Sequence, residues 1–236
     1  TVVSPHGLTV PPTNVYLLLE ATVFTNQVAT PDTQGSTQYV CNGWAADGGA
    51  APTNGLGTHA VVTVTGAGAL NWLWTTNYWL NTAAGPHGSV NVGDGWQRFG
   101  AVTSITAAAD QYYHFTNWTG DASGGANPLN LLMDAPKAVM ANFAQNMTTS
   151  SPTPVPEEWM AQFGLTNFEA DASADPDQDG QKTWEEYVAS ESNPTYPASF
   201  FHTDQAHVLG TNYTEQVYTN AEPPYVVFTQ RVYEIL

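Results

Sequence analysis

The first 146 residues consist of short stretches in which apolar and polar residues alternate, separated by Gly, Pro and Asn. One example is Ala60–Thr65, which is followed by the turn sequence Gly66-Ala-Gly68. A period of two residues places side chains alternately on the two faces of a strand. This part of the chain is therefore predicted to form strands joined by hairpins.

Two passages of this region resemble each other, which predicts a tandem repeat. The order and spacing match, because Ser4–Val10 corresponds to Gly85–Val90 and Cys41–Asp47 corresponds to Phe115–Asp121. His6 and His87 occupy matching turn positions and are expected to have a structural role.

Each copy closes with an alternating strand, Leu70–Trp74 in the first and Val139–Phe143 in the second. Trp74 and Phe143 are then equivalent residues. The first copy is longer than the second, and we expect the excess to form an extended loop in the polar stretch Thr25–Thr37.

A different composition begins at Asn146–Pro156, which is rich in Ser, Thr and Pro and is predicted to be a semi-rigid, extended linker. The next segment, Pro156–Phe163, suits a short helix with proline in its first turn and Trp159 and Phe163 on one face. Gly164 is expected to end this helix.

The last part of the chain predicts two strands, Tyr225–Thr229 and Arg231–Leu236. The second resembles the middle of a β-sandwich module. We therefore expect this segment either to be truncated or to pair with another chain by strand addition.

The charge is strongly acidic, with four basic residues against 21 acidic ones. Residues 1–155 carry seven acidic and two basic side chains (net −5), and residues 156–236 carry fourteen and two (net −12). Phosphate backbones are repelled by such a chain, so nucleic acid is excluded as a partner. Crowded carboxylates are stabilised by a divalent cation, and we expect one in the C-terminal third.

The segment Asp175–Glu186 matches the calcium-loop pattern D-x-[DN]-x-[DN]-G-x₅-E at every specified position. In this pattern alternate carboxylates turn inward, the glycine permits a sharp turn, and the final glutamate closes the shell. The predicted Ca²⁺ ligands are Asp175, Asp177, Asp179, the carbonyl oxygen of Gln181, and Glu186. Magnesium is less suited, because it keeps its waters and rarely occupies all-protein cages.

Another interpretation of this segment needs no metal. Asp-rich turns are often only solvated, and Thr183-Trp-Glu-Glu186 can be a capping box that opens a helix. A capping box accounts for Glu186 but not for the three alternating aspartates. Asp171 is a further residue that could assist a cation.

The repeats also carry a family resemblance. The run Tyr113–Ala122, with Asn127-Pro-Leu129, Met133-Asp134 and Ala138–Phe143, resembles the divergent InlB B-repeat of bacterial surface proteins. Tyr39–Trp44 and Leu70–Trp74 look like the variant that often precedes it. The resemblance covers about residues 1–145 and implies a small β-grasp-like fold, used as a stalk or adhesive module without catalytic residues.

The acidic segment resembles the dockerin-like and thrombospondin type 3-like calcium modules of large exported bacterial proteins. In those modules a Trp-bearing helix precedes the loop and a Glu-Tyr helix follows it, as do Trp159 and Glu186-Tyr187 here. Ser190–Pro194 departs from the Gly-Thr-Asp-Pro that often comes next, so no second site is predicted.

The predicted fold class is mainly β, with tandem small β-grasp-like repeats, a short helix–calcium loop–helix module and a terminal β segment. The expected boundaries are 1–80 and 81–146 for the repeats, 147–155 for the linker, 156–197 for the calcium module and 198–236 for the terminal segment.

The expected function is that of a non-enzymatic, extracellular structural or adhesive protein of the bacterial cell surface. No catalytic motif is present, Cys41 is a lone cysteine expected to act as a small apolar core residue, and no apolar run could insert into a membrane. The expected partners are copies of the same chain, other surface proteins, or glycans. Any export signal is expected to lie outside this sequence.

Two other functions stay open. One is a fibre or filament subunit, which tandem modules and a terminal strand would suit. The other is a carbohydrate-binding accessory module of a larger secreted enzyme, because aromatic rings can stack on sugars. Trp44, Trp72, Trp74 and Trp118 are expected in the core, which leaves Trp79 and Trp96 as the exposed rings.

Overall fold

Strands dominate the computed structural model, which describes residues 1–190, 192–199, 201–208, 213–220 and 227–233. The predicted mainly β class is confirmed for this part of the chain. None of the helices described has the length and apolar composition to cross a bilayer.

The strands are, in chain order, β1 Val2–Val3, β2 Thr9–Val10, β3 Val23–Val28, β4 Asp32–Gln34, β5 Thr37–Asp47, β6 Ala50–Ala51, β7 Asn54–Leu56, β8 His59–Val64, β9 Ala69–Ala84, β10 Gly88–Val90, β11 Gly95–Arg98, β12 Val102–Ile105, β13 Ala107–Ala109, β14 Tyr113–Gly120, β15 Leu129–Leu132, β16 Lys137–Gln145, β17 Phe201–Val208, β18 Tyr213–Asn220 and β19 Val227–Tyr233.

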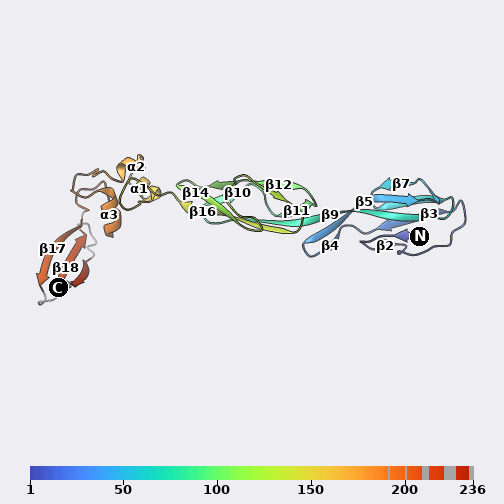
Figure 1. Cartoon of the computed structure of the whole chain (residues 1–236), viewed down its shortest axis with the longest axis horizontal. Coiled ribbons are helices and arrows are strands. Elements are labelled where there is room, and N and C mark those ends of the chain that lie inside the picture. The colour runs from blue at the N-terminus through green and yellow to red at the C-terminus, as the bar shows by residue number, and fades with distance from the viewer. Residues whose placement is uncertain (191, 200, 209–212, 221–226, 234–236) are drawn as a thin grey trace. The chain divides into compact units, whose positions relative to one another are not determined.

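The chain divides into two compact units, one made of 1–109 and 115–143 and the other of 110–114 and 144–236. In the first unit, strand β9 passes through both predicted repeats and can be followed in Figure 1. It pairs with β5 and β1 along its first part and with β11 and β16 along its second. The expected boundary between residues 80 and 81 therefore falls inside a continuous strand.

Each repeat has its own apolar core. In the first, one face of β5 and β9 packs on the sheet β2-β3-β8-β6 around Trp44 and Trp72. In the second, β9, β14 and β16 pack on β12 and β15 around Trp118. The prediction that these three tryptophans lie in the core is confirmed, and Trp74 is half-buried against the first core.

The two cores share a packing detail between an aromatic ring and the glycine that follows His6 or His87. A Cβ atom added to Gly7 would lie 2.7 Å from the ring of Trp74, and one added to Gly88 would lie 2.3 Å from the ring of Phe143. His6 stacks on Tyr39 with ring centroids 3.4 Å apart, in keeping with a structural role. The equivalence of Trp74 and Phe143 agrees with this packing.

The stretch Thr25–Thr37 differs from the extended loop expected there. It holds most of β3 and all of β4, and β3 pairs with β8 in the small sheet. Asn26 is buried on β3 and accepts a hydrogen bond from Trp72 Nε1 at 2.8 Å. The polar composition did not indicate this strand, because one of its two buried side chains is an amide, which a tryptophan satisfies.

The second unit contains three short helices among its described residues, α1 Glu157–Gln162, α2 Phe168–Asp171 and α3 Thr183–Ser190. They enclose a small core of Val155, Trp159, Met160 and Ala172. Strands β17, β18 and β19 form an antiparallel sheet. Two strands were expected over 225–236, but the described part forms one, β19, and residues 225–226 and 234–236 lie outside the described residues.

The predicted linker is folded back on itself rather than extended. Thr148 and Val155 are buried, and their backbones join through Thr148 N–H to Val155 O at 2.9 Å. Val155 N–H donates to Thr148 Oγ1 at 2.9 Å, and Met147 bridges to Pro156. The Ser and Thr side chains supply hydrogen bonds that close the segment, which composition alone does not reveal.

Candidate metal centre

The acidic loop lies between α2 and α3, and aromatic packing joins α3 to α1. The Trp159 ring of α1 lies 5.0 Å from that of Phe163 and 5.1 Å from that of Tyr187 on α3, measured between centroids. Ala172, just before the loop, is buried in the same core, which therefore holds both ends of the loop. Helix α1 begins after Pro156 and is followed by Gly164 at φ +77°, as the sequence predicts.

Within the loop, backbone N–H groups donate to the aspartates and curl the chain. Asp175 accepts from Gln178 N–H at 2.8 Å and from Gly180 N–H at 3.0 Å, and Asp179 accepts from Gln181 N–H at 2.8 Å. Gly180 has φ +99°, a conformation that side chains disfavour. Its place in the loop pattern is thus explained by backbone geometry.

The curl brings three of the predicted ligands together. One carboxylate oxygen each of Asp175, Asp177 and Asp179 lies within 4.8 Å of the other two. Burial and then the charges of Asp179 and Asp175 raise the pKa of Asp177, which the N–H of Asp179 partly offsets. The cluster therefore concentrates negative charge in the loop.

Glu186 is the most unusual group of this site. Its side chain is fully buried on α3, and its Oε1 accepts a hydrogen bond from Ser192 Oγ at 3.3 Å. Among the residues that the structure describes, Oε2 has no hydrogen-bond partner. Burial, followed by the charges of Asp177 and Asp179, raises the pKa of Glu186 to about 8. A buried carboxylate in this condition is costly unless a cation compensates it.

The helix cap is supplied by a different glutamate from the one expected. Glu185 Oε2 accepts from the N–H of Lys182 at 2.8 Å, whereas Thr183 N–H donates to the carbonyl of Ala174 at 2.9 Å. The capping box over Thr183–Glu186 is therefore wrong by one residue. Glu186 does not cap the helix. The interpretation that needs no metal, in which Glu186 belongs to a capping box, therefore does not account for this residue.

The other candidate ligands are not part of the cluster formed by the three aspartates. Glu186 lies outside the 4.8 Å group, although the charges of Asp177 and Asp179 act on it. Asp171 also lies outside that group and accepts from Asn167 N–H at 2.9 Å. The carbonyl of Gln181 stays a prediction.

The donor set agrees with a hard divalent cation. Oδ2 of Asp177 and Oδ2 of Asp179 are buried and, like Glu186 Oε2, have no hydrogen-bond partner among the described residues. No ion pair joins any of these carboxylates to a Lys or Arg in the described ranges. Ca²⁺ takes about six to eight oxygen ligands, including carboxylates and carbonyls. The residues present fit that ion.

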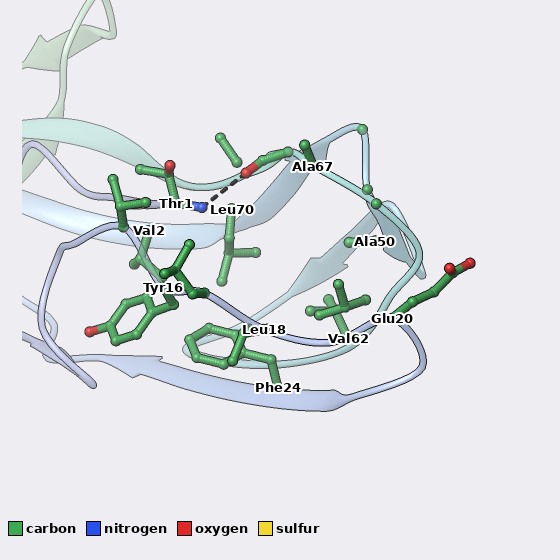
Figure 2. Close-up of a pocket in the computed structure, with 18 residues that line it drawn as sticks. Thr1, Val2, Tyr16, Leu18, Glu20, Phe24, Ala50, Val62, Ala67 and Leu70 are labelled. Atoms are coloured by element: carbon green, nitrogen blue, oxygen red, sulfur yellow. Dashed lines mark hydrogen bonds between the residues drawn. The ribbon is translucent and has the colours of Figure 1, made fainter.

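A cavity in the first repeat has a different character. It encloses about 420 Å³, and Val2, Phe24, Val62 and Leu70 are among its lining side chains. Figure 2 shows the bond from Thr1 N to the carbonyl of Gly68, 2.9 Å long, at its edge, and the Glu20 carboxylate directed away from the apolar side chains. The cavity is mainly apolar and presents no cluster of titratable side chains.

One comparison with known proteins gives a match. Residues 78–147 match the family described as the divergent InlB B-repeat domain. No curated protein and no solved structure matches the chain. The resemblance is therefore confirmed for the second repeat, and this segment is similar to a domain associated with bacterial surface proteins. The likeness of the first repeat to its variant, and of the acidic segment to calcium modules, stays a prediction.

Proposed function

We propose that the chain is an extracellular structural or adhesive module of a bacterial surface protein, and that Asp175–Glu186 stabilises it by binding one calcium ion. The observation that carries the calcium proposal is Glu186, fully buried beside three converging aspartates with one oxygen unbonded within the described structure. The match of residues 78–147 supports the surface role. No catalytic role is proposed.

The oxygens of Asp175, Asp177, Asp179 and Glu186 would hold the ion, together with the carbonyl of Gln181. Calcium affinities of extracellular modules are on the order of 10⁻⁴ to 10⁻³ M. An ion present at several times its Kd stabilises the folded state by about 1 kcal/mol or more. In the proposed role, the ion removes the repulsion between these carboxylates and orders the module.

Calcium titration of the whole chain tests the proposal. Heat released on binding is measured by calorimetry, and hydrogen exchange locates the protected residues. We expect one site, with protection gained over 156–197 and none over 1–143. Magnesium at the same concentration is expected to protect less, because it dehydrates reluctantly.

Two neighbouring variants make a matched pair. Glu186→Gln removes a proposed ligand and is expected to weaken calcium binding at least about tenfold. Glu185→Gln alters the helix cap next to it and should leave the affinity within about a factor of two. Calcium binding that is absent from the wild type, or equal loss in both variants, would contradict the proposal.

A further inference from the structure

The outer face of the sheet in the first unit carries a polar and aromatic surface that the calcium loop does not involve. On β9, Trp72 and Leu80 are buried in the two cores. Because side chains alternate along a strand, Thr75, Asn77 and Trp79 point to the opposite face. Three residues of one strand therefore face away from both cores.

Neighbouring strands add residues to this face through their register. Val40 of β5 lies opposite Thr75, and Arg98 of β11 lies opposite Asn77. Trp96 lies opposite Trp79 in the same pairing. Directly opposed residues of an antiparallel pair project to the same side of the sheet. The surface thus brings together side chains from three strands.

Two features of this surface suit a sugar. Val40, Asn42, Thr75, Asn77 and Arg98 line a shallow cavity of about 280 Å³. Beside it, the rings of Trp79 and Trp96 meet edge to face with centroids 5.1 Å apart, and both are only partly buried. Amide and hydroxyl groups bind sugar hydroxyls, and exposed indole surface packs on the apolar face of a sugar ring.

Arg98 indicates what charge a sugar bound on this surface should carry. It is exposed, and no ion pair or hydrogen bond of its guanidinium occurs within the described residues. It is one of four basic residues in a chain of net charge −17, so a cation here, at the rim of a polar cavity, is unusual. The planar guanidinium pairs with a carboxylate through two parallel hydrogen bonds.

We propose that the face formed by Arg98, Asn77, Asn42, Trp79 and Trp96 binds a saccharide that bears a carboxylate, such as a uronic acid residue. Arg98 receives the carboxylate, the two asparagines bind hydroxyl groups, and the indole pair packs on an adjacent sugar ring. Most of the acidic side chains belong to residues 156–236, outside the unit that carries this face. This site is independent of the calcium proposal.

A neutral isostere of the ligand provides the test. The whole chain is titrated with a galacturonic acid trisaccharide and with its methyl ester, in chelator so that calcium cannot bridge the sugar to protein. Binding is followed by calorimetry at about 0.15 M salt. We expect the acid to bind at least about tenfold more tightly than the ester.

Variants assign the parts of the site. Arg98→Gln should reduce acid binding to the level of the ester and leave ester binding unchanged. Trp96→Ala should weaken both ligands. Lys137→Gln, which removes a lysine paired with Asp134 at 2.9 Å, is the matched control and should change neither. Unchanged melting of Arg98→Gln shows that its fold is intact. No binding of the acid, equal binding of acid and ester, or acid binding that survives Arg98→Gln would overturn the proposal.

Discussion

Trp159 on α1 and Tyr187 on α3 have ring centroids 5.1 Å apart, in a core that also holds Ala172, just before the acidic loop. Trp159 precedes the first aspartate of the loop, and Tyr187 directly follows its last glutamate. Thr183 N–H also donates to the carbonyl of Ala174 at 2.9 Å, so the two ends of the loop are joined before any cation binds. A loop whose ends are already held together loses less conformational entropy when its carboxylates bind an ion than a free loop would lose.

Removing the Trp159 side chain should destabilise the small core that packs beside the acidic loop. The side chain is 8% exposed, and truncating a buried tryptophan costs about 3–5 kcal/mol. We expect Trp159→Ala to lower the stability of the second unit by this amount and to weaken calcium binding with it. Chemical denaturation with and without calcium measures both effects. Val188→Ala on α3 is the control, since Val188 is 57% exposed and should cost less than about 0.5 kcal/mol.

The packing of Gly88 against Phe143 makes a second prediction. A methyl group at Gly88 would lie 2.3 Å from the ring, so Gly88→Ala should cost about 1–3 kcal/mol through overpacking. Gly93→Ala meets no atom within 4 Å and should be nearly neutral. Adding Phe143→Leu should recover part of the loss, and a double-mutant cycle measures that coupling. Equal cost of the two alanine variants would argue against the packing.

Local patterns in the sequence predict much of this protein. Alternation of apolar and polar residues predicts the sheets, and matching positions predict that Gly7 and Gly88 occupy similar places. The spacing of Asp175, Asp177 and Asp179 predicts a curled loop, because the pattern fixes which backbone N–H groups meet which carboxylates. Such features depend on neighbours along the chain, which the sequence displays directly.

Features that depend on distant partners were not predicted. Glu185 and Glu186 are identical in type, and only the packing of α3 determines which one caps the helix and which is buried. Asn26 gives no sign in the sequence that Trp72 will satisfy it inside a core. Strand β9 joins the two repeats because β11 and β16 extend the sheet beside it, which no local pattern encodes.

The pH dependence of the metal-free protein tests the environment of Glu186. Its pKa in the folded state is raised from 4.5 to about 8, so folding favours the protonated form. The stability that this group contributes is present below pH 4.5 and is lost as the pH rises through 8. The raised pKa of Asp177 acts in the same direction.

In chelator, the melting temperature of the second unit should therefore fall as the pH is raised from about 5 to 9. Glu186→Gln should remove most of that fall, because the amide does not ionise. Excess calcium should abolish it in the wild type, since the proposed ion compensates the charged form. Hydrogen exchange over 183–189 at each pH separates this effect from changes in the repeats. A flat profile in chelator would contradict the buried position of Glu186.

The closed form of residues 147–155 depends on another carboxylate, Glu169. It accepts from the backbone N–H of Thr149 at 3.0 Å and of Ser150 at 2.8 Å. The hydroxyl of Ser150 and then the N–H of Thr149 lower the pKa of Glu169 below its usual 4.5. The stability that Glu169 contributes to the folded state is thus present above pH 4.5 and is lost as the pH falls. This pH dependence is opposite in direction to that of Glu186.

Glu169→Ala should open this segment at neutral pH, because two backbone donors lose their acceptor. We expect faster hydrogen exchange over 148–152 and new protease cleavage there, with exchange over 1–109 unchanged. Glu20→Ala, an exposed glutamate of the first repeat, is the control and should alter neither. If the wild-type segment exchanges as rapidly as the variant, its hydrogen bonds do not hold it closed, and the extended linker expected from its Ser, Thr and Pro content would be the better description. If only the variant opens, the closed form belongs to the folded module, and the acid-sensitive carboxylate of Glu169 maintains it.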